Sequence, residues 1–281
     1  MLYPWNYVNK IINRIIWVTQ KNTEAEENRA LKKEELKEKI RRSNSPKMDY
    51  IKKVKSISIW IFIVPFISVN VCLIIITKFH QILAPGVPIH SSMLPYIDGG
   101  VSISRVVRNY PLYLIFKPAM FLTSFLLIRY WLHTKEIIKS FDQHHKHIKK
   151  ILFFGIGSAV CLTIHSIFLG IKIDHDLYKF LRRVVMLSFI IFELVAQAYL
   201  ITTYLELKEK LKIVINQKIL KIKKNLITVL IIASIIAIPF LPFNNFKFLK
   251  HALEWNLFLG VITFYLLTFF MWKKNNLVFI E

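Results

Sequence analysis

The chain has 281 residues, of which 54% are hydrophobic, and it carries a net charge of +22. The apolar residues are concentrated in blocks of about 20, the length that crosses the ~30 Å hydrocarbon core of a membrane. A soluble domain spreads them over amphipathic faces instead. In a membrane protein, excess Lys and Arg belong to cytoplasmic loops, so this composition argues against a soluble fold and a nucleic-acid partner.

The two cysteines, Cys72 and Cys161, both fall inside apolar blocks and lack metal-ligand spacing. We therefore expect no disulfide framework and no zinc site. The sequence has no P-loop, Gly-rich dinucleotide turn, zinc-protease histidine motif or nucleophile elbow. It therefore predicts no cofactor and gives no support for enzymatic activity.

Residues 1–55 are expected to form a cytoplasmic extension of two helices, without a cleavable signal peptide. Apolar residues at helical spacing over 8–18, opposite basic ones, are typical of an amphipathic helix. Such a helix lies in the headgroup layer or packs on the bundle or on a partner. The charged stretch Thr23–Arg42 opens with a capping-box pattern, and residues 43–46 are expected to end it. A charged helix is usually a solvated face, but it also offers a docking surface for protein partners.

The remaining chain predicts an all-α polytopic membrane bundle, with a transmembrane domain over 56–274 and a cytoplasmic tail over 275–281. Alternate connecting segments hold about three times as many Lys and Arg as the others, which places both termini in the cytoplasm. The six apolar blocks lie near Ile57–Thr77, Pro111–Leu132, Ile151–Ile171, Val184–Tyr204, Leu226–Phe243 and Leu253–Trp272.

Polar residues inside these blocks are candidates for function, because polar groups are costly in the hydrocarbon layer. Glu193 lies near the middle of the fourth block, and Gln197 follows four residues later on the same helical face. His165 lies in the outer half of the third block. The three side chains are expected to share an inward-facing cluster. It is either a hydrogen-bonded knot that fixes helix packing or a polar groove for a lipid headgroup, ion or proton.

The first exofacial segment, residues 78–110, is the longest and contains a turn-rich stretch with Asp98. It is either a lid that shapes the mouth of the bundle or a simple connector. Lys117, near the outer boundary, is expected to pair with a lipid phosphate. The histidine-rich run over 144–147 resembles a metal site, but the lysines around it repel a cation. We expect a basic surface near anionic headgroups there.

Several short motifs carry a family resemblance. The exofacial stretch Pro95-Tyr96-Ile97-Asp98-Gly99 resembles the Pro-Tyr-Ile-Ser-Asp stretch of the DRAM/Frag/Sfk membrane proteins. In that family a Pro and an Ile-Phe lead into the second helix, which ends in Arg-Tyr. This chain has Pro111, Ile115-Phe116 and Arg129-Tyr130, and Gln197 is similar to a glutamine in the family's fourth helix.

The chain departs from the family pattern: the Ser of the loop motif is missing, and ten residues separate Gly100 from Pro111. In addition, Leu112 stands in place of a Glu, and the charged N-terminal extension is not part of the usual pattern. The resemblance implies six helices with both termini inside, in an endomembrane or the plasma membrane. Members are associated with glycolipid-anchor lipid remodelling, transbilayer lipid asymmetry and autophagy at endolysosomal membranes. The resemblance therefore implies a lipid-linked, non-enzymatic role.

Two hypotheses follow for the function of this chain. The first is a lipid-handling membrane protein in which Asp98, Lys117, His165, Glu193 and Gln197 line an outer-half polar groove. The second is a non-catalytic structural or accessory subunit of a larger membrane complex, held through residues 1–55. A secondary transporter is less favoured, because no inverted repeat or pair of Gly-broken helices is visible.

Overall fold

The computed structural model describes residues 4–79, 94–171, 175–237, 239 and 244–273. They belong to two compact units that divide after residue 48. Helices make up nearly all of this part of the chain, and an isolated bridge between Ile215 and Trp272 is the one β-type pairing described within it. The predicted all-α class is thus confirmed for the described residues.

Helix α1 runs from Pro4 to Lys78 without interruption. The predicted start at Thr23 and the predicted break over 43–46 are therefore wrong. Pro46 removes one backbone donor, but that cost is local and many of the surrounding residues are good helix formers. Side chains at 21, 26, 27 and 29–35 are exposed. The side chains over 8–18, on which the amphipathic prediction depends, lie outside the described residues.

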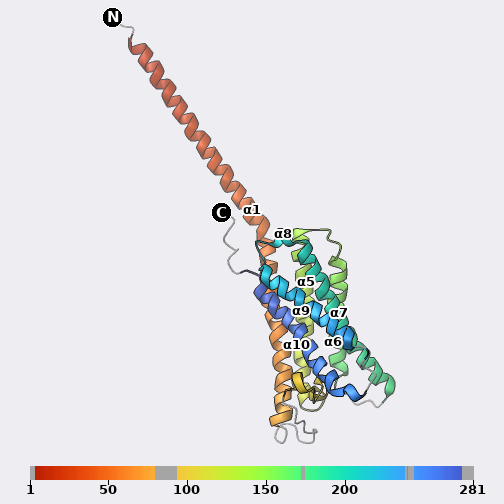
Figure 1. Cartoon of the computed structure of the whole chain (residues 1–281). Coiled ribbons are helices and arrows are strands. Elements are labelled where there is room, and N and C mark those ends of the chain that lie inside the picture. Colours follow the sequence, from red (N-terminus) through yellow and green to blue (C-terminus); the bar gives the residue numbers. More distant parts are fainter. Residues whose placement is uncertain (1–3, 80–93, 172–174, 238, 240–243, 274–281) are drawn as a thin grey trace. The chain divides into compact units, whose positions relative to one another are not determined.

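The second unit is a bundle of helices that run back and forth (Figure 1). The short helices α3 and α4 lie at the end of the bundle opposite α8 (Figure 1). After α1 the elements are α3 (Pro95–Asp98), α4 (Ile103–Val107), α5 (Leu112–Phe141), α6 (Ile148–Phe168), α7 (Asp176–Glu206), α8 (Lys208–Leu211), α9 (Gln217–Ala237), η2 (Asn244–Phe246) and α10 (Lys247–Met271).

Among the described residues, five helical segments are long and apolar enough to cross a membrane: Met48–Lys78 of α1, and α5, α6, α7 and α10. The chain is therefore an integral membrane protein by the character of its helices. The predicted block Leu226–Phe243 begins inside α9, and its residues 238 and 240–243 lie outside the described part. The first turns of α9 carry four lysines, which lower its apolar character: Lys218, Lys221, Lys223 and Lys224.

Close helix packing places the core between α5, α6, α7 and α10. Helix α6 packs on both α5 and α7, while α10 packs on α9, α7, α3 and α4. At Gly155 of α6, a Cβ atom would lie 2.5 Å from the fully buried indole of Trp131 on α5. Large apolar side chains face outward on the same helices, as on a lipid-facing surface, for example Phe121, Phe153 and Phe270.

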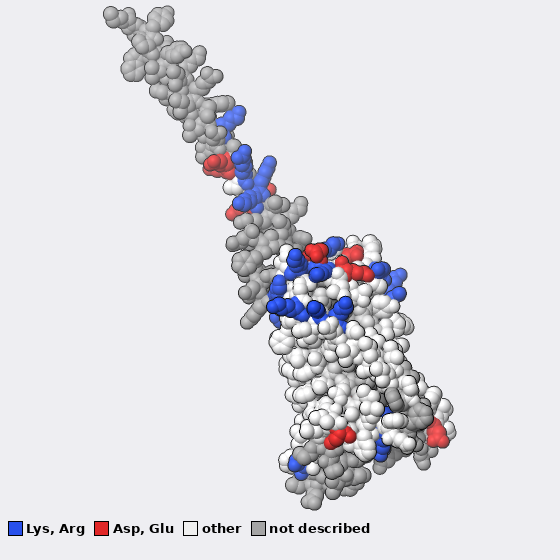
Figure 2. All heavy atoms as spheres, in the orientation of Figure 1, with Lys and Arg blue, Asp and Glu red and all other residues white. Residues whose placement is uncertain are grey.

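Charge is unevenly distributed over the bundle. On the face shown in Figure 2, Lys and Arg gather around the end that carries α8, and the middle of the bundle shows almost none. This pattern is that of an apolar belt bordered by a basic headgroup layer. Exposed lysines from several elements occur near this end: Lys52, Lys149, Lys150, Lys208, Lys210, Lys212 and Lys218.

Candidate functional site

An apolar cavity of about 90 Å³ lies inside the bundle, between α1, α4, α5, α6, α7 and α10. Most of its walls are aliphatic or aromatic, as at Met120, Phe189 and Phe258. A cavity of this size has room for several water molecules or for the end of an acyl chain. The polar side chains among those that line it are Ser104, Thr123, His165, Glu193, Glu254 and Tyr265.

Glu193 of α7 is one of the polar residues that line this cavity. Its side chain is fully buried and accepts hydrogen bonds from Ser158 Oγ at 2.6 Å and Gln197 Nε2 at 2.9 Å. The hydroxyl of Tyr265 on α10 is a third donor to the same carboxylate. Gln197 Nε2 also lies 3.3 Å from the carbonyl oxygen of Val261.

This arrangement gives both oxygens of the Glu193 side chain a partner and joins three helices at one point. A buried carboxylate without such donors is very costly, so the network removes most of that cost. The predicted pairing of Glu193 with Gln197 is confirmed, since a hydrogen bond joins their side chains. Glu193 thus links α6, α7 and α10 in a hydrogen-bonded knot, and it also lines the cavity.

His165 of α6 lines the same cavity but at a different level. It follows Ser158, the α6 partner of Glu193, by seven residues, which is about 10 Å along a helix axis. Its Nδ1 atom is buried and has no hydrogen-bond partner among the described residues. The expected trio is therefore split: Glu193 and Gln197 are joined by a hydrogen bond, whereas His165 lines the cavity at another level, nearer the α3–α4 end. Gln197 is not among the residues that line the cavity.

The loop that carries α3 and α4 is fixed onto the N-terminal half of α10. Trp255 Nε1 donates to the carbonyl of Val101 at 2.8 Å, and Asn256 Nδ2 donates to the carbonyl of Tyr96 at 2.7 Å. The Tyr96 hydroxyl donates to Asn70 Oδ1 on α1 at 3.1 Å. Burial raises the pKa of Tyr96, so this hydroxyl stays protonated. The described part of the loop is held in a defined shape, as its turn-rich sequence predicts.

Asp98 and Lys117 take positions outside the cavity wall. Asp98 is exposed, and its Oδ1 accepts a hydrogen bond from the backbone of Gly100 at 2.8 Å, which shapes the turn after α3. Lys117 Nζ donates to the carbonyl of Ile167 at 3.3 Å and lies 5.4 Å from the centre of the Tyr113 ring. These contacts give Asp98 a role in loop structure and direct Lys117 toward α6.

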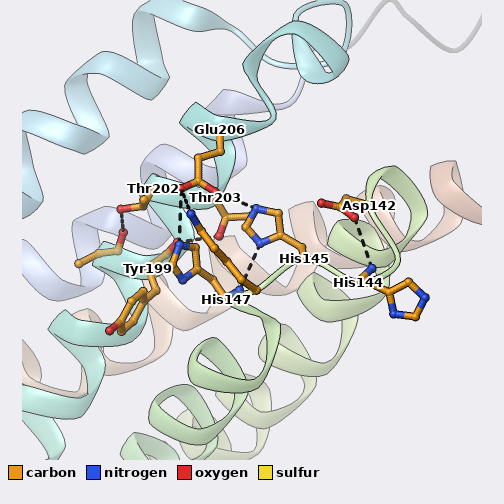
Figure 3. A network of polar contacts seen from close by, with 10 residues as sticks. Asp142, His144, His145, His147, Tyr199, Thr202, Thr203 and Glu206 are labelled. Carbon is orange, nitrogen blue, oxygen red and sulfur yellow. Dashed lines mark hydrogen bonds and ion pairs between the residues drawn. The ribbon is translucent and has the colours of Figure 1, made fainter.

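The histidine-rich run forms a separate cluster with the end of α7 (Figure 3). Glu206 lies between His145 Nε2 at 3.1 Å and Lys146 Nζ at 3.0 Å, and His147 Nε2 lies 3.6 Å away. The His147 and Tyr199 rings, tilted against each other with their centroids 5.2 Å apart, extend the contact along α7. This cluster ties the α5–α6 turn to α7, and Lys146 pairs with the same Glu206 carboxylate.

Several polar residues of the site were not among the sequence candidates, among them Ser158, which donates to Glu193, and Glu254 and Tyr265, which line the cavity. Ser158 and Tyr265 are common residue types in membrane helices, and only the spatial register of α6 and α10 brings them to Glu193. Glu254 is the second residue of its apolar block, a position where a charged residue usually marks the end of a membrane span. A carboxylate at the beginning of an apolar block was the signal in the sequence that could have identified Glu254 as a site residue.

No group of three or more His, Cys, Asp or Glu side chains in the described part of the chain is arranged to hold a metal ion. In comparisons with known proteins, no family model, no curated protein and no solved structure matches this chain.

Proposed function

We propose that this chain is a multi-pass membrane protein with a lipid-handling role, in which the cavity receives part of a membrane lipid. One observation carries the proposal: an apolar cavity with few polar groups lies inside a bundle of membrane-length helices. Ligand sites between helices typically combine apolar walls with a few polar groups that fix orientation. In a membrane, the most abundant molecules that match such walls are lipids.

Glu193 and Tyr265 give the inner end of the cavity a polar surface, while Glu254, His165 and Ser104 give the outer end another. An acyl chain suits the apolar wall between these two levels. The proposed role is therefore to bind and position a lipid. Membrane lipids are accordingly the proposed partners of the site.

We propose six membrane crossings, with α9 as the fifth and both termini on the cytoplasmic side. The support is the band of lysines at the α8 end of the bundle (Figure 2), because basic residues remain on the cytoplasmic side of a membrane. The lysines of the first turns of α9 then lie at that boundary, and the mainly apolar residues 226–237 enter the membrane.

Cysteine labelling tests this topology. Single cysteines at Lys212 and at the exposed Lys247, which precede and follow α9, are placed in a chain with Cys72→Ser and Cys161→Ser and exposed to a membrane-impermeant maleimide on sealed vesicles. The two positions should label from opposite sides of the membrane. Labelling of both from the same side would overturn the six-crossing topology.

We also propose membership of the DRAM/Frag/Sfk family and, with it, a location in endomembranes or the plasma membrane. The support is the motif Pro95-Tyr96-Ile97-Asp98-Gly99, which coincides with the α3 turn that is fixed onto α10. The turn uses Gly99 with φ of 60°, where a Cβ atom would overlap the carbonyl of Phe248.

Photo-crosslinking tests the lipid-handling proposal directly. A phospholipid with a diazirine near the end of its acyl chain is incorporated into proteoliposomes with the full chain, and labelled peptides are mapped by mass spectrometry. Labelling of cavity residues such as Met120 and Phe258, reduced by excess unlabelled lipid, is the expected result. Labelling confined to outward-facing residues such as Phe121 and Phe153 would contradict the proposal.

A second candidate function is that of an accessory subunit of a membrane complex. The observation that favours it is α1, which extends from Pro4 and exposes charged side chains over residues 29–35. Affinity purification of the full chain and of a chain without residues 1–47 compares their partners. A stoichiometric partner that is lost with residues 1–47 would support this role, and identical partner sets would argue against it.

A further inference from the structure

Two arginines of α4 lie beside the outer end of the cavity. Ser104 and Val107 line the cavity, and each is followed directly by an arginine, Arg105 and Arg108. Helix α4 packs on α5 and α10, which places these residues at the mouth of the bundle. Arg105 is half-buried and Arg108 is exposed.

A third arginine approaches the same place from α7. Arg182 is half-buried and lies one helical turn before Met186, which lines the cavity. It lies close enough to interact electrostatically with Arg108 and with His165. Burial, followed by the like charges of Arg182 and Arg105, lowers the pKa of Arg108. The three guanidinium groups therefore concentrate positive charge around one end of the cavity.

None of the ion pairs found within the described residues includes Arg105, Arg108 or Arg182. Glu254 interacts electrostatically with Arg105, and it accepts hydrogen bonds from the backbone of Ile103 and Ser104. Three guanidinium groups thus gather at one end of the cavity, an arrangement that favours an anionic ligand there.

Membrane orientation does not account for this cluster. Basic residues are favoured on the cytoplasmic side, whereas α4 and the start of α7 belong to the proposed exofacial side. All arginines of the exofacial segments, Arg105, Arg108, Arg182 and Arg183, lie in α4, directly after it or near the start of α7. Arginine presents a planar fork of donors that matches the oxygens of a phosphate, which an exposed lysine does not.

We propose that the cavity takes a glycerophospholipid whose phosphate lies among Arg105, Arg108 and Arg182, with an acyl chain extending along the cavity toward Tyr265. This inference rests on the proposed lipid-handling function and adds the chemical class of the headgroup. It also moves the phosphate from Lys117, the sequence candidate, to the arginines. The apolar cavity directly inside the cluster favours a lipid phosphate over a free phosphate ion.

Native mass spectrometry of the purified full chain tests the inference with three ligands that share the same two oleoyl chains. These are phosphatidic acid, phosphatidylcholine and diacylglycerol, and inorganic phosphate alone is a fourth ligand. Both phospholipids should bind at least about tenfold more tightly than diacylglycerol, a difference of about 1.4 kcal/mol. The variant Arg108→Gln with Arg182→Gln should bind phospholipids no better than diacylglycerol, with its affinity for diacylglycerol unchanged.

Lys212→Gln, an exposed change at the opposite end of the bundle, is the matched control and should bind as wild type does. Equal affinity of wild type for all three lipids would overturn the phosphate site and leave the lipid-handling role intact. Binding of none of the three would overturn both. Tight binding of inorganic phosphate without any preference among the lipids would assign the arginines to a soluble anion and overturn the inference. A thermal unfolding midpoint close to that of wild type shows that the arginine variant is folded.

Discussion

The Nζ atom of Lys223 donates a hydrogen bond to Oγ1 of Thr268 at 2.6 Å inside the bundle. The amine also lies 3.8 Å from the centre of the Phe264 ring, and the lysine side chain is fully buried. No carboxylate among the described residues pairs with it. The positive charge of Lys223 is therefore compensated by a hydroxyl group and an aromatic face, at the contact between α9 and α10.

Replacing Lys223 by methionine should leave the thermal stability of the protein unchanged or raise it. The apolar stem keeps its packing, while the cost of burying an amine disappears. Thr268→Val should instead lower the stability by about 1–3 kcal/mol, because it leaves the buried amine without its hydrogen-bond acceptor. Thermal unfolding in one detergent compares the two, with the exposed Lys224→Met as control. A Lys223→Met protein less stable than Thr268→Val would mean that the charge itself stabilises the bundle.

Fluorescent-lipid scrambling in proteoliposomes distinguishes the roles of Glu193 and Gln197. If lipid moves through the cavity, wild type scrambles lipid and Glu193→Ala reduces the rate, because Glu193 lines the cavity. Gln197→Ala should reduce it less, since Gln197 reaches the site only through Glu193 and Val261. Both proteins must first elute as folded monodisperse species. Equal scrambling rates in all three folded proteins would show that lipid does not move through this cavity.

Gly99→Ala should destabilise the loop that carries α3 by about 1–3 kcal/mol. The residue has a positive φ, and its added methyl group would overlap the carbonyl of Phe248 at the start of α10. Gly100→Ala is the matched control, because positive φ occurs at Gly99 and Gly170 but not at Gly100. Thermal unfolding and limited proteolysis of the loop measure the effect. Equal stability of the two variants would show that the loop adapts at no cost.

The sequence predicted most of the helices because about 20 consecutive apolar residues have few alternatives to a membrane span. It also predicted the Glu193–Gln197 hydrogen bond, since residues four apart on one helix share a face. The predicted helix start at Thr23 and the predicted break at Pro46 were wrong, because these local signals do not interrupt α1. Capping and proline patterns bias a helix boundary, but flanking residues with high helix propensity outweigh them.

The partners of Glu193 could not be predicted, because they depend on how separate helices are rotated and shifted against one another. Ser158 and Tyr265 lie 35 and 72 residues from Glu193 in the chain. Arg105 and Arg182 are separated by the whole of α5 and α6, so their common position at the mouth is also a product of packing. In the sequence alone, these arginines cannot be distinguished from ordinary charged residues of connecting segments.

The most direct test of the cavity as a lipid site is to fill it. Met186→Trp adds a large side chain to the cavity wall, whereas Val160→Trp adds the same side chain on the exposed face of α6. Native mass spectrometry measures the lipid that remains bound to each purified protein. Loss of the bound lipid from Met186→Trp, with retention by wild type and Val160→Trp, is the predicted result. Equal retention by all three proteins would contradict a lipid site in this cavity.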